Sequence, residues 1–220
     1  MNLALIPLFM KQLQIPLLSQ IHRVTSMEQV SASLNNLNKH AIDTAPWSGF
    51  DYVPKVEFSI AHNNDCIYLK YYVEEAVVKA AYYQQDDPVY KDSCVEFFIA
   101  FEREEEYYNL EFNAIGTCKL NFGKDRKDRV IISERLIKKI RYLATIQNME
   151  NAINWELSLS IPKEVFSQHL ITYLSGKTCK ANFYKCGDEL PVPHFLCWNN
   201  IETPEPDFHV RRCFGSVQFL

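Results

Sequence analysis

The chain has 220 residues, of which 47% are hydrophobic and 13% aromatic, and it contains only 6 glycines. This composition supplies a packed core and excludes a largely disordered protein, and the length suits one large all-β domain. The formal net charge of −4 argues against a surface that neutralises phosphates, because nucleic-acid binders carry a basic excess. We therefore expect a single domain over residues 1–220 and no nucleic-acid partner.

The first 44 or so residues are expected to form an N-terminal extension with a leading strand and one short helix. The N-terminal apolar stretch has no basic segment before it and no small-residue cleavage site after it, which makes a poor signal peptide. A start at Met10 rather than Met1 would give MKQLQIPLL, an ordinary strand sequence. No window approaches the roughly 18 apolar residues that a membrane span requires. These features predict a cytoplasmic protein without a membrane partner.

Residues 26–39 have apolar side chains at helical spacing, and Ser26 is suited to cap the helix that this spacing predicts. From residue 55 onward the period changes to two, with many β-branched and aromatic residues. The strand-like segments are 55–62, 66–73, 77–83, 94–101, 107–114, 118–123, 140–147, 154–162, 179–187, 194–200 and 215–220. Further helical turns are expected at 133–138 and at 162–170, where Pro162 suits a first helical position.

About ten short strands at this spacing predict an all-β fold, an antiparallel β-sandwich of the jelly-roll or immunoglobulin-like type with one or two short helices. The seven cysteines form no C-x-x-C pair, and the six histidines form no H-x-x-x-H or H-E-x-x-H motif. We therefore expect reduced thiols in the core, no metal site and no cofactor. Asp86 and Asp87 offer oxygen ligands for calcium, the one weak alternative, although such loop acids are typically solvated.

The run VYKDSCVEFFIAF, residues 89–101, carries one carboxylate, Glu96, on a strand face that is otherwise apolar. A hairpin at 102–106 that pairs residue 100 with residue 107 places Glu96 directly opposite Glu111. Opposed carboxylates repel unless a cation, an arginine or lysine, or a polyol lies between them. Alternatively, Glu96 has only a structural role, as a strand glutamate that faces solvent or forms a salt bridge.

A proline-stiffened segment near the end of the chain contains aromatic and hydrogen-bonding side chains, including Phe208, His209 and Arg211. Aromatic faces with a few convergent polar groups suit a sugar ring, because its C–H faces pack on rings while its hydroxyls need donors and acceptors. Paired carboxylates are equally the apparatus of glycosidases, so an enzyme that uses Glu96 and Glu111 remains an alternative.

Five segments in order resemble the family 9 carbohydrate-binding module, in the branch common in gut Bacteroidetes. They are DPVYKDSCVEFF, YYNLEFNAIGT, WELSLSIP, ANFYKCGD and HFLCWNNIETPEPDFHVRRCFGSVQF, within residues 45–220. The resemblance implies a bacterial β-sandwich that binds sugars without cleaving them, with the reducing end of a glycan held between two tryptophans. Tyr90 and Phe208 stand at the positions of these tryptophans, and Glu96 matches a glutamate that accepts sugar hydroxyls. Glu111 stands where the sugar-binding members carry arginine.

Together these observations predict non-catalytic binding of a mono- or oligosaccharide. The predicted ligand-binding residues are Tyr90, Glu96, Glu111, Asn182, Phe208, His209 and Arg211. Trp47, Trp155 and Trp198 are expected in the core, since large aromatic residues are mostly buried. Besides the enzyme, a second alternative is an intracellular interaction domain that has kept the fold and lost the sugar.

Overall fold

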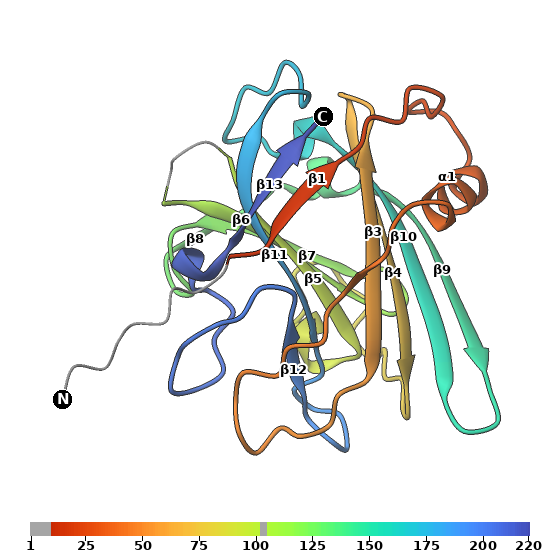
Figure 1. Ribbon diagram of the computed structural model, residues 1–220, viewed down its shortest axis with the longest axis vertical. Helices are drawn as coiled ribbons and strands as arrows, with labels where there is room; N and C mark the ends of the chain where they lie inside the picture. Colours follow the sequence, from red (N-terminus) through yellow and green to blue (C-terminus); the bar gives the residue numbers. More distant parts are fainter. Residues whose placement is uncertain (1–9, 102–104) are drawn as a thin grey trace.

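The structure is a computed structural model that describes residues 10–101 and 105–220. Two β-sheets pack face to face, as Figure 1 shows, so the predicted all-β sandwich is confirmed. Residues 1–9 of the leading segment and residues 102–104 of the predicted hairpin turn lie outside the described residues.

One sheet has eight strands, in the order β1-β13-β11-β5-β6-β7-β8 with β12 paired to β11. In chain order these strands are β1 (Gln12–Ile15), β5 (Cys94–Ala100), β6 (Tyr107–Asn113), β7 (Cys118–Gly123), β8 (Arg129–Ile131), β11 (Thr178–Cys186), β12 (Phe195–Cys197) and β13 (Gly215–Phe219). All pairs are antiparallel except β1 with β13. Because β1 pairs within this sheet, part of the N-terminal extension belongs to the sandwich.

The other sheet has five strands in the order β2-β3-β4-β10-β9. They are β2 (His40–Ala41), β3 (Lys55–His62), β4 (Cys66–Glu75), β9 (Arg141–Asn148) and β10 (Ile153–Pro162). Helix α1 (Met27–Asn35) covers its outer face, where Met27, Val30 and Leu34 are buried against strand residues. The hydroxyl of Ser26 accepts a hydrogen bond from the Gln29 amide, so the predicted cap is confirmed.

The core lies between the sheets and is closed by stacked aromatic rings. Phe183 of β11 stacks on Phe58 of β3 at 3.8 Å and on Phe97 of β5 at 5.0 Å between ring centroids. The three tryptophans are buried, as predicted. All seven cysteines are buried and none forms a disulfide, which confirms the expectation of free thiols. The described helices include none long and apolar enough to cross a membrane.

The strand predicted over 77–83 is wrong, because this segment is irregular. Its backbone N–H groups donate hydrogen bonds to side chains of the following loop instead of to another strand. The hydroxyl of Ser93 accepts from the Lys79 amide, and the carboxylate of Asp92 accepts from the Tyr82 amide. The two short strands β2 and β8 were not predicted, since two or three residues show no period. The remaining short helices are α2 (Glu134–Ile137) and the 3₁₀ turns η1 (Val89–Lys91), η2 (Lys163–Val165) and η3 (Arg211–Cys213). The helix predicted at 162–170 is therefore only one turn.

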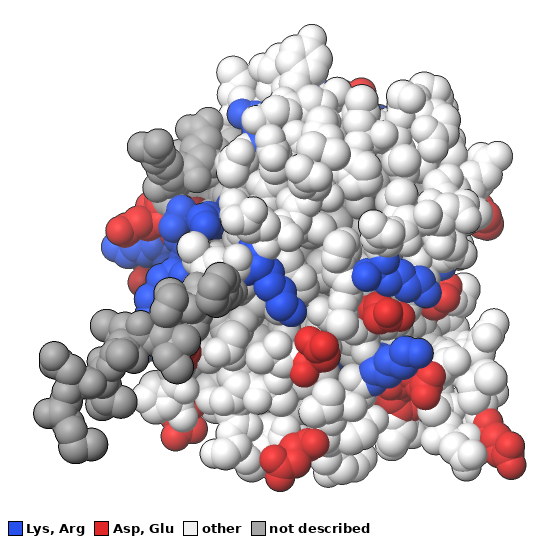
Figure 2. All heavy atoms as spheres, viewed as in Figure 1, with Lys and Arg blue, Asp and Glu red and all other residues white. Residues whose placement is uncertain are grey.

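Charged side chains of both signs lie interspersed on the face of the molecule in Figure 2. Several form exposed ion pairs, such as Arg23 with Glu164 at 2.7 Å. This mixed pattern differs from the basic stripe of a nucleic-acid binder.

One ion pair is fully buried and links the two sheets. The Nζ of Lys185 on β11 lies 2.9 Å from an oxygen of Glu75 on β4 and 2.8 Å from Nε2 of His194. The other Glu75 oxygen accepts a hydrogen bond from the indole of Trp155. Burial lowers the pKa of His194 to about 4, so its ring is neutral and accepts from Lys185.

Replacing Lys185 with Met should lower the free energy of unfolding by about 3–5 kcal/mol, because the Glu75 carboxylate would stay buried without its partner. Lys138→Met, which breaks the exposed pair with Glu134, should cost less than about 0.5 kcal/mol. Urea denaturation measures both values. The double variant Glu75→Gln with Lys185→Met should recover much of the loss, and equal effects of the two lysine variants would contradict the assignment.

Candidate functional site

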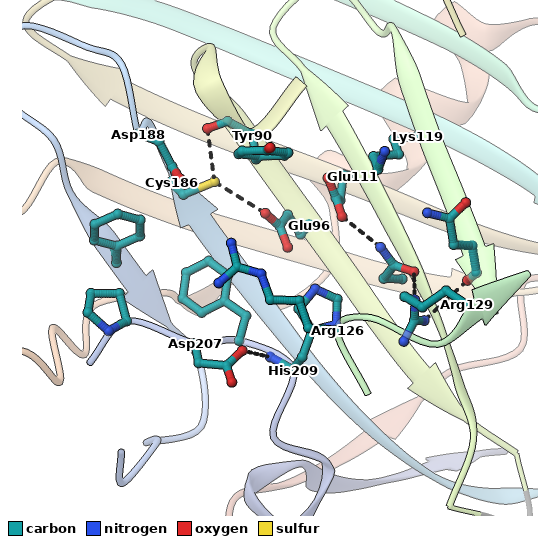
Figure 3. Close-up of a pocket in the computed structure, with 15 residues that line it drawn as sticks. Tyr90, Glu96, Glu111, Lys119, Arg126, Arg129, Cys186, Asp188, Asp207 and His209 are labelled. Atoms are coloured by element: carbon teal, nitrogen blue, oxygen red, sulfur yellow. Dashed lines mark hydrogen bonds between the residues drawn. The ribbon is translucent and has the colours of Figure 1, made fainter. Parts of the chain in front are cut away.

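A cavity of about 240 Å³ opens on the face of the eight-stranded sheet that is turned away from the five-stranded sheet. Strands β5, β6, β7 and β11 form its floor, and the loops before β5, after β7 and before β13 surround it (Figure 3). Its lining residues are Tyr90, Glu96, Asn109, Glu111, Lys119, Asn121, Arg126, Arg129, Cys186, Asp188, Phe195, Pro206, Asp207, Phe208 and His209. Five of the seven predicted site residues are among them.

Two carboxyl groups lie side by side on the floor, as the predicted register requires. Glu96 on β5 pairs directly with Glu111 on β6, so the predicted register is confirmed. The thiol of Cys186 donates to Glu96 Oε1 at 3.2 Å, and the amide of Asn109 donates to Glu111 Oε1 at 2.6 Å. Within the described part of the chain, Oε2 of Glu111 is buried without a hydrogen-bond partner. The floor therefore keeps an unused acceptor.

Both floor carboxyls hold their protons more tightly than an ordinary glutamate. Burial raises the pKa of Glu111 to about 7, against the opposing effect of the Asn109 amide and the nearby Lys119 charge. Burial and the adjacent Glu111 raise the pKa of Glu96 well above its usual range. The protonated form of Glu96 is thereby favoured, and in that form the carboxyl offers an O–H donor as well as an acceptor oxygen.

Basic side chains from the loop between β7 and β8 and from the start of β8 offset the acidic floor. Arg129 donates to Asn109 Oδ1 and to the carbonyl of Tyr107, both at 2.9 Å, and its guanidinium lies 4.5 Å from the Tyr107 ring centroid. Arg126 also lines the pocket, and Figure 3 places it close to His209. Sequence reasoning missed both arginines, because the charged run KDRKDR resembles a solvated turn.

The aromatic residues of the wall are fixed by packing. Phe208 stacks on Tyr184 with ring centroids 4.2 Å apart and planes 10° from parallel. Tyr90 lies on η1, is half-buried, and its carbonyl accepts a hydrogen bond from the Asp188 amide. Nδ1 of His209 lies 2.8 Å from the hydroxyl of Tyr107. Burial lowers the pKa of His209 to about 3. His209 is therefore a neutral wall residue.

Two predicted site residues do not line the pocket. Asn182 is fully buried, and its side-chain amide forms hydrogen bonds with backbone groups. It donates to the Asn199 carbonyl and accepts from the backbone amides of Phe183 and Asn199. It therefore anchors β11 to the chain after β12. Arg211 lies on η3, outside the lining, and the cations that do line the pocket are Lys119, Arg126 and Arg129.

Comparison with known proteins gives the class to which this fold and pocket belong. The model of carbohydrate-binding family 9 matches residues 27–219, nearly the whole chain. The chain belongs to carbohydrate-binding family 9, and the resemblance in its motifs is thereby confirmed. Among proteins with curated functions, none matches it.

Solved structures agree with this assignment. A Bacteroides uniformis protein proposed to bind carbohydrate shares 33% identity with the chain, with a TM-score of 0.90, and the match covers 96% of this chain and all of that one. A family 9 module from Caldicellulosiruptor kristjanssonii in complex with glucose has a TM-score of 0.57 at 10% identity, over 96% of each chain. A family 9 module from the same organism in complex with cellotriose gives 0.57 at 11% identity, over 95% of this chain and 93% of that one. These last two show the shared fold.

The buried floor predicts an unusual pH dependence of stability. Because the folded-state pKa of Glu111 is raised to about 7, the folded protein keeps a proton that the unfolded chain has already lost above pH 4.5. The free energy of unfolding should therefore fall as pH rises from 4.5 to 7, by about 1.4 kcal/mol for each unit of pKa difference. Glu111→Gln should reduce this slope and should be more stable than wild type at pH 8.

Urea titrations at several pH values, with chelator present, measure how the free energy of unfolding changes with pH. Glu134→Gln, on the exposed side of α2, is the matched control and should leave it unchanged. A free energy of unfolding that rises between pH 4.5 and 7, or an equal slope in Glu111→Gln, would contradict the assignment.

Proposed function

We propose that this chain binds a sugar in the pocket above Glu96 and Glu111 and does not cleave it. The observation that carries the proposal is the combination within one cavity of two buried carboxyl groups and aromatic side chains on the wall. The family match and the sugar complexes of the related fold support it.

The aromatic wall suits the apolar faces of a sugar ring. Tyr90 comes from the loop before β5, whereas Phe208 comes from the loop before β13, so the two rings reach the cavity from different segments. In the proposal they pack on the ring of the bound sugar, with Phe195 beside Phe208 at 6.2 Å between centroids. Stacking of Phe208 on Tyr184 holds one platform in place before the ligand arrives.

The floor supplies the polar recognition. A sugar hydroxyl is both donor and acceptor, and the carboxyl of Glu96, whose protonated form burial favours, offers the same pair of functions when it carries its proton. The unpartnered Oε2 of Glu111 accepts a second hydroxyl in this arrangement. Arg129 already donates to several protein acceptors, so Arg126 is the cation that we assign to the ligand.

The size of the cavity favours a small ligand. Its volume of about 240 Å³ is below the range of about 300–1,000 Å³ for drug-sized ligands. We infer that the pocket holds one sugar ring, either a free monosaccharide or the terminal unit of an oligosaccharide. Binding should be modest in affinity, because the sugar exchanges hydrogen bonds with water for hydrogen bonds with protein.

The arrangement of the carboxyls favours binding over hydrolysis. Residues paired across antiparallel strands project from the same face of the sheet, so Glu96 and Glu111 meet a bound ring from one side. A glycosidase instead places its two carboxyls on either side of the scissile bond. A screen with chromogenic glycosides should show no turnover, and turnover that disappears in Glu96→Gln would favour the enzyme.

Isothermal titration with glucose, cello-oligosaccharides and a wider sugar panel tests binding. Tyr90→Ala should weaken binding by about tenfold through lost stacking, and Glu96→Ala by five- to a hundredfold through lost hydrogen bonds. Tyr83→Ala is the matched control, because Tyr83 is 75% exposed and lies outside the cavity lining. Absence of binding to every sugar at millimolar concentration would overturn the proposal and favour an interaction domain.

A further inference from the structure

Three side chains that commonly bind metals meet at the floor of the pocket. Cys94 and Glu96 come from β5, and Cys186 lies opposite Cys94 on the neighbouring strand β11. The two sulfur atoms and a carboxylate oxygen all lie within 4.8 Å of one another. Sequence spacing gave no sign of this cluster, because it is made by strand pairing between segments at least 90 residues apart.

The cluster is close to the dimensions of a metal centre. A tetrahedral zinc ion lies about 2.3 Å from thiolate sulfur and about 2.0–2.2 Å from a carboxylate oxygen, which puts neighbouring ligands ~3.5–3.8 Å apart. Cys186 Sγ and Glu96 Oε1 are already 3.2 Å apart. The sulfur of Cys94, the third donor, therefore needs to move by about 1 Å at most to reach the spacing of a tetrahedral site. Side-chain rotation can provide such a shift.

The charge environment also favours a cation. Glu111 lies beside Glu96, and its buried Oε2 lacks a hydrogen-bond partner among the described residues. The two glutamates therefore share a floor where Lys119, Arg126 and Arg129 offset part of the negative charge, and protonation or a bound positive ion would relieve the remaining repulsion. This unsatisfied oxygen is an observation independent of the cysteines.

The fourth coordination position faces the cavity. Cys186 and Glu96 both line the pocket, whereas Cys94 is fully buried behind them. Figure 3 shows the Cys186 sulfur directed toward the Glu96 carboxyl. An ion held by these three groups would be reached from the pocket, and water or a sugar hydroxyl would complete its tetrahedron.

We propose that Cys94, Glu96 and Cys186 form a site for a thiophilic divalent cation of the zinc class. Two sulfur ligands select such an ion over calcium or magnesium, which prefer oxygen. On binding, the two thiols and the Glu96 carboxyl release their protons to solvent, and the thiolates and carboxylate coordinate the ion. The site does not depend on sugar binding, but because Glu96 belongs to both sites, a bound ion changes the affinity for sugar.

Cobalt titration of the full, reduced chain tests the proposal, because tetrahedral Co²⁺ with thiolate ligands absorbs in the visible and near-ultraviolet. One equivalent should bind, Zn²⁺ should displace it, and Cys94→Ser and Cys186→Ser should each weaken binding at least tenfold. Cys66→Ser is the matched control, since Cys66 is equally buried but lies in the cluster beneath α1. Unchanged binding in both cysteine variants, or no thiolate absorbance in wild type, would overturn the site.

X-ray absorption spectroscopy of the zinc-loaded wild type needs no variant and covers the case in which a serine variant does not fold. Two sulfur ligands and at least one oxygen are expected, and zero or one sulfur would overturn the proposal. Sugar titration of the chelator-treated protein keeps the two proposals separate, because failure of the metal site leaves sugar binding in metal-free buffer unchanged.

Discussion

The position of β5 between β6 and β11 is the constraint on which the pocket depends. Alternation along β5 sends Val95 and Phe97 into the core and Glu96 to the outer face. The register with β6 then places Glu111 beside Glu96, and the register with β11 brings Cys186 to the same floor. A slip of one residue would exchange the two faces of β5, so the same register determines both the core and the polar floor.

Local patterns predicted most of the fold and the centre of the floor. Period-two runs located nearly every strand, since a half-buried strand must alternate, and the predicted register between residues 100 and 107 placed Glu96 opposite Glu111. The sequence pattern pointed to Phe208, the resemblance to the family matched Tyr90 and Phe208 to stacking positions, and both residues reach the cavity. The segment 77–83 has the composition of a strand but bonds to loop side chains instead, a tertiary effect that no local pattern contains.

The rest of the site depends on contacts between distant segments. Arg126 and Arg129 look like members of a solvated turn until the fold lays that turn over the floor. Asn182 has the residue type of a ligand-binding group, but its amide is saturated by backbone partners. The positive charge near the acids thus comes from Lys119 on β7, Arg126 in the β7–β8 loop and Arg129 at the start of β8, whereas Glu111 takes the place of the arginine expected on β6. Through Arg126 the β7–β8 loop also lines one side of the pocket.

A crystal structure of the protein with glucose tests the central claim most directly, because it locates the ligand instead of inferring it from variants. The account predicts one sugar ring in the cavity, packed against Tyr90 and Phe208, with hydroxyls within hydrogen-bond distance of Glu96 and Glu111. A sugar bound elsewhere on the chain while this cavity holds only water would contradict it.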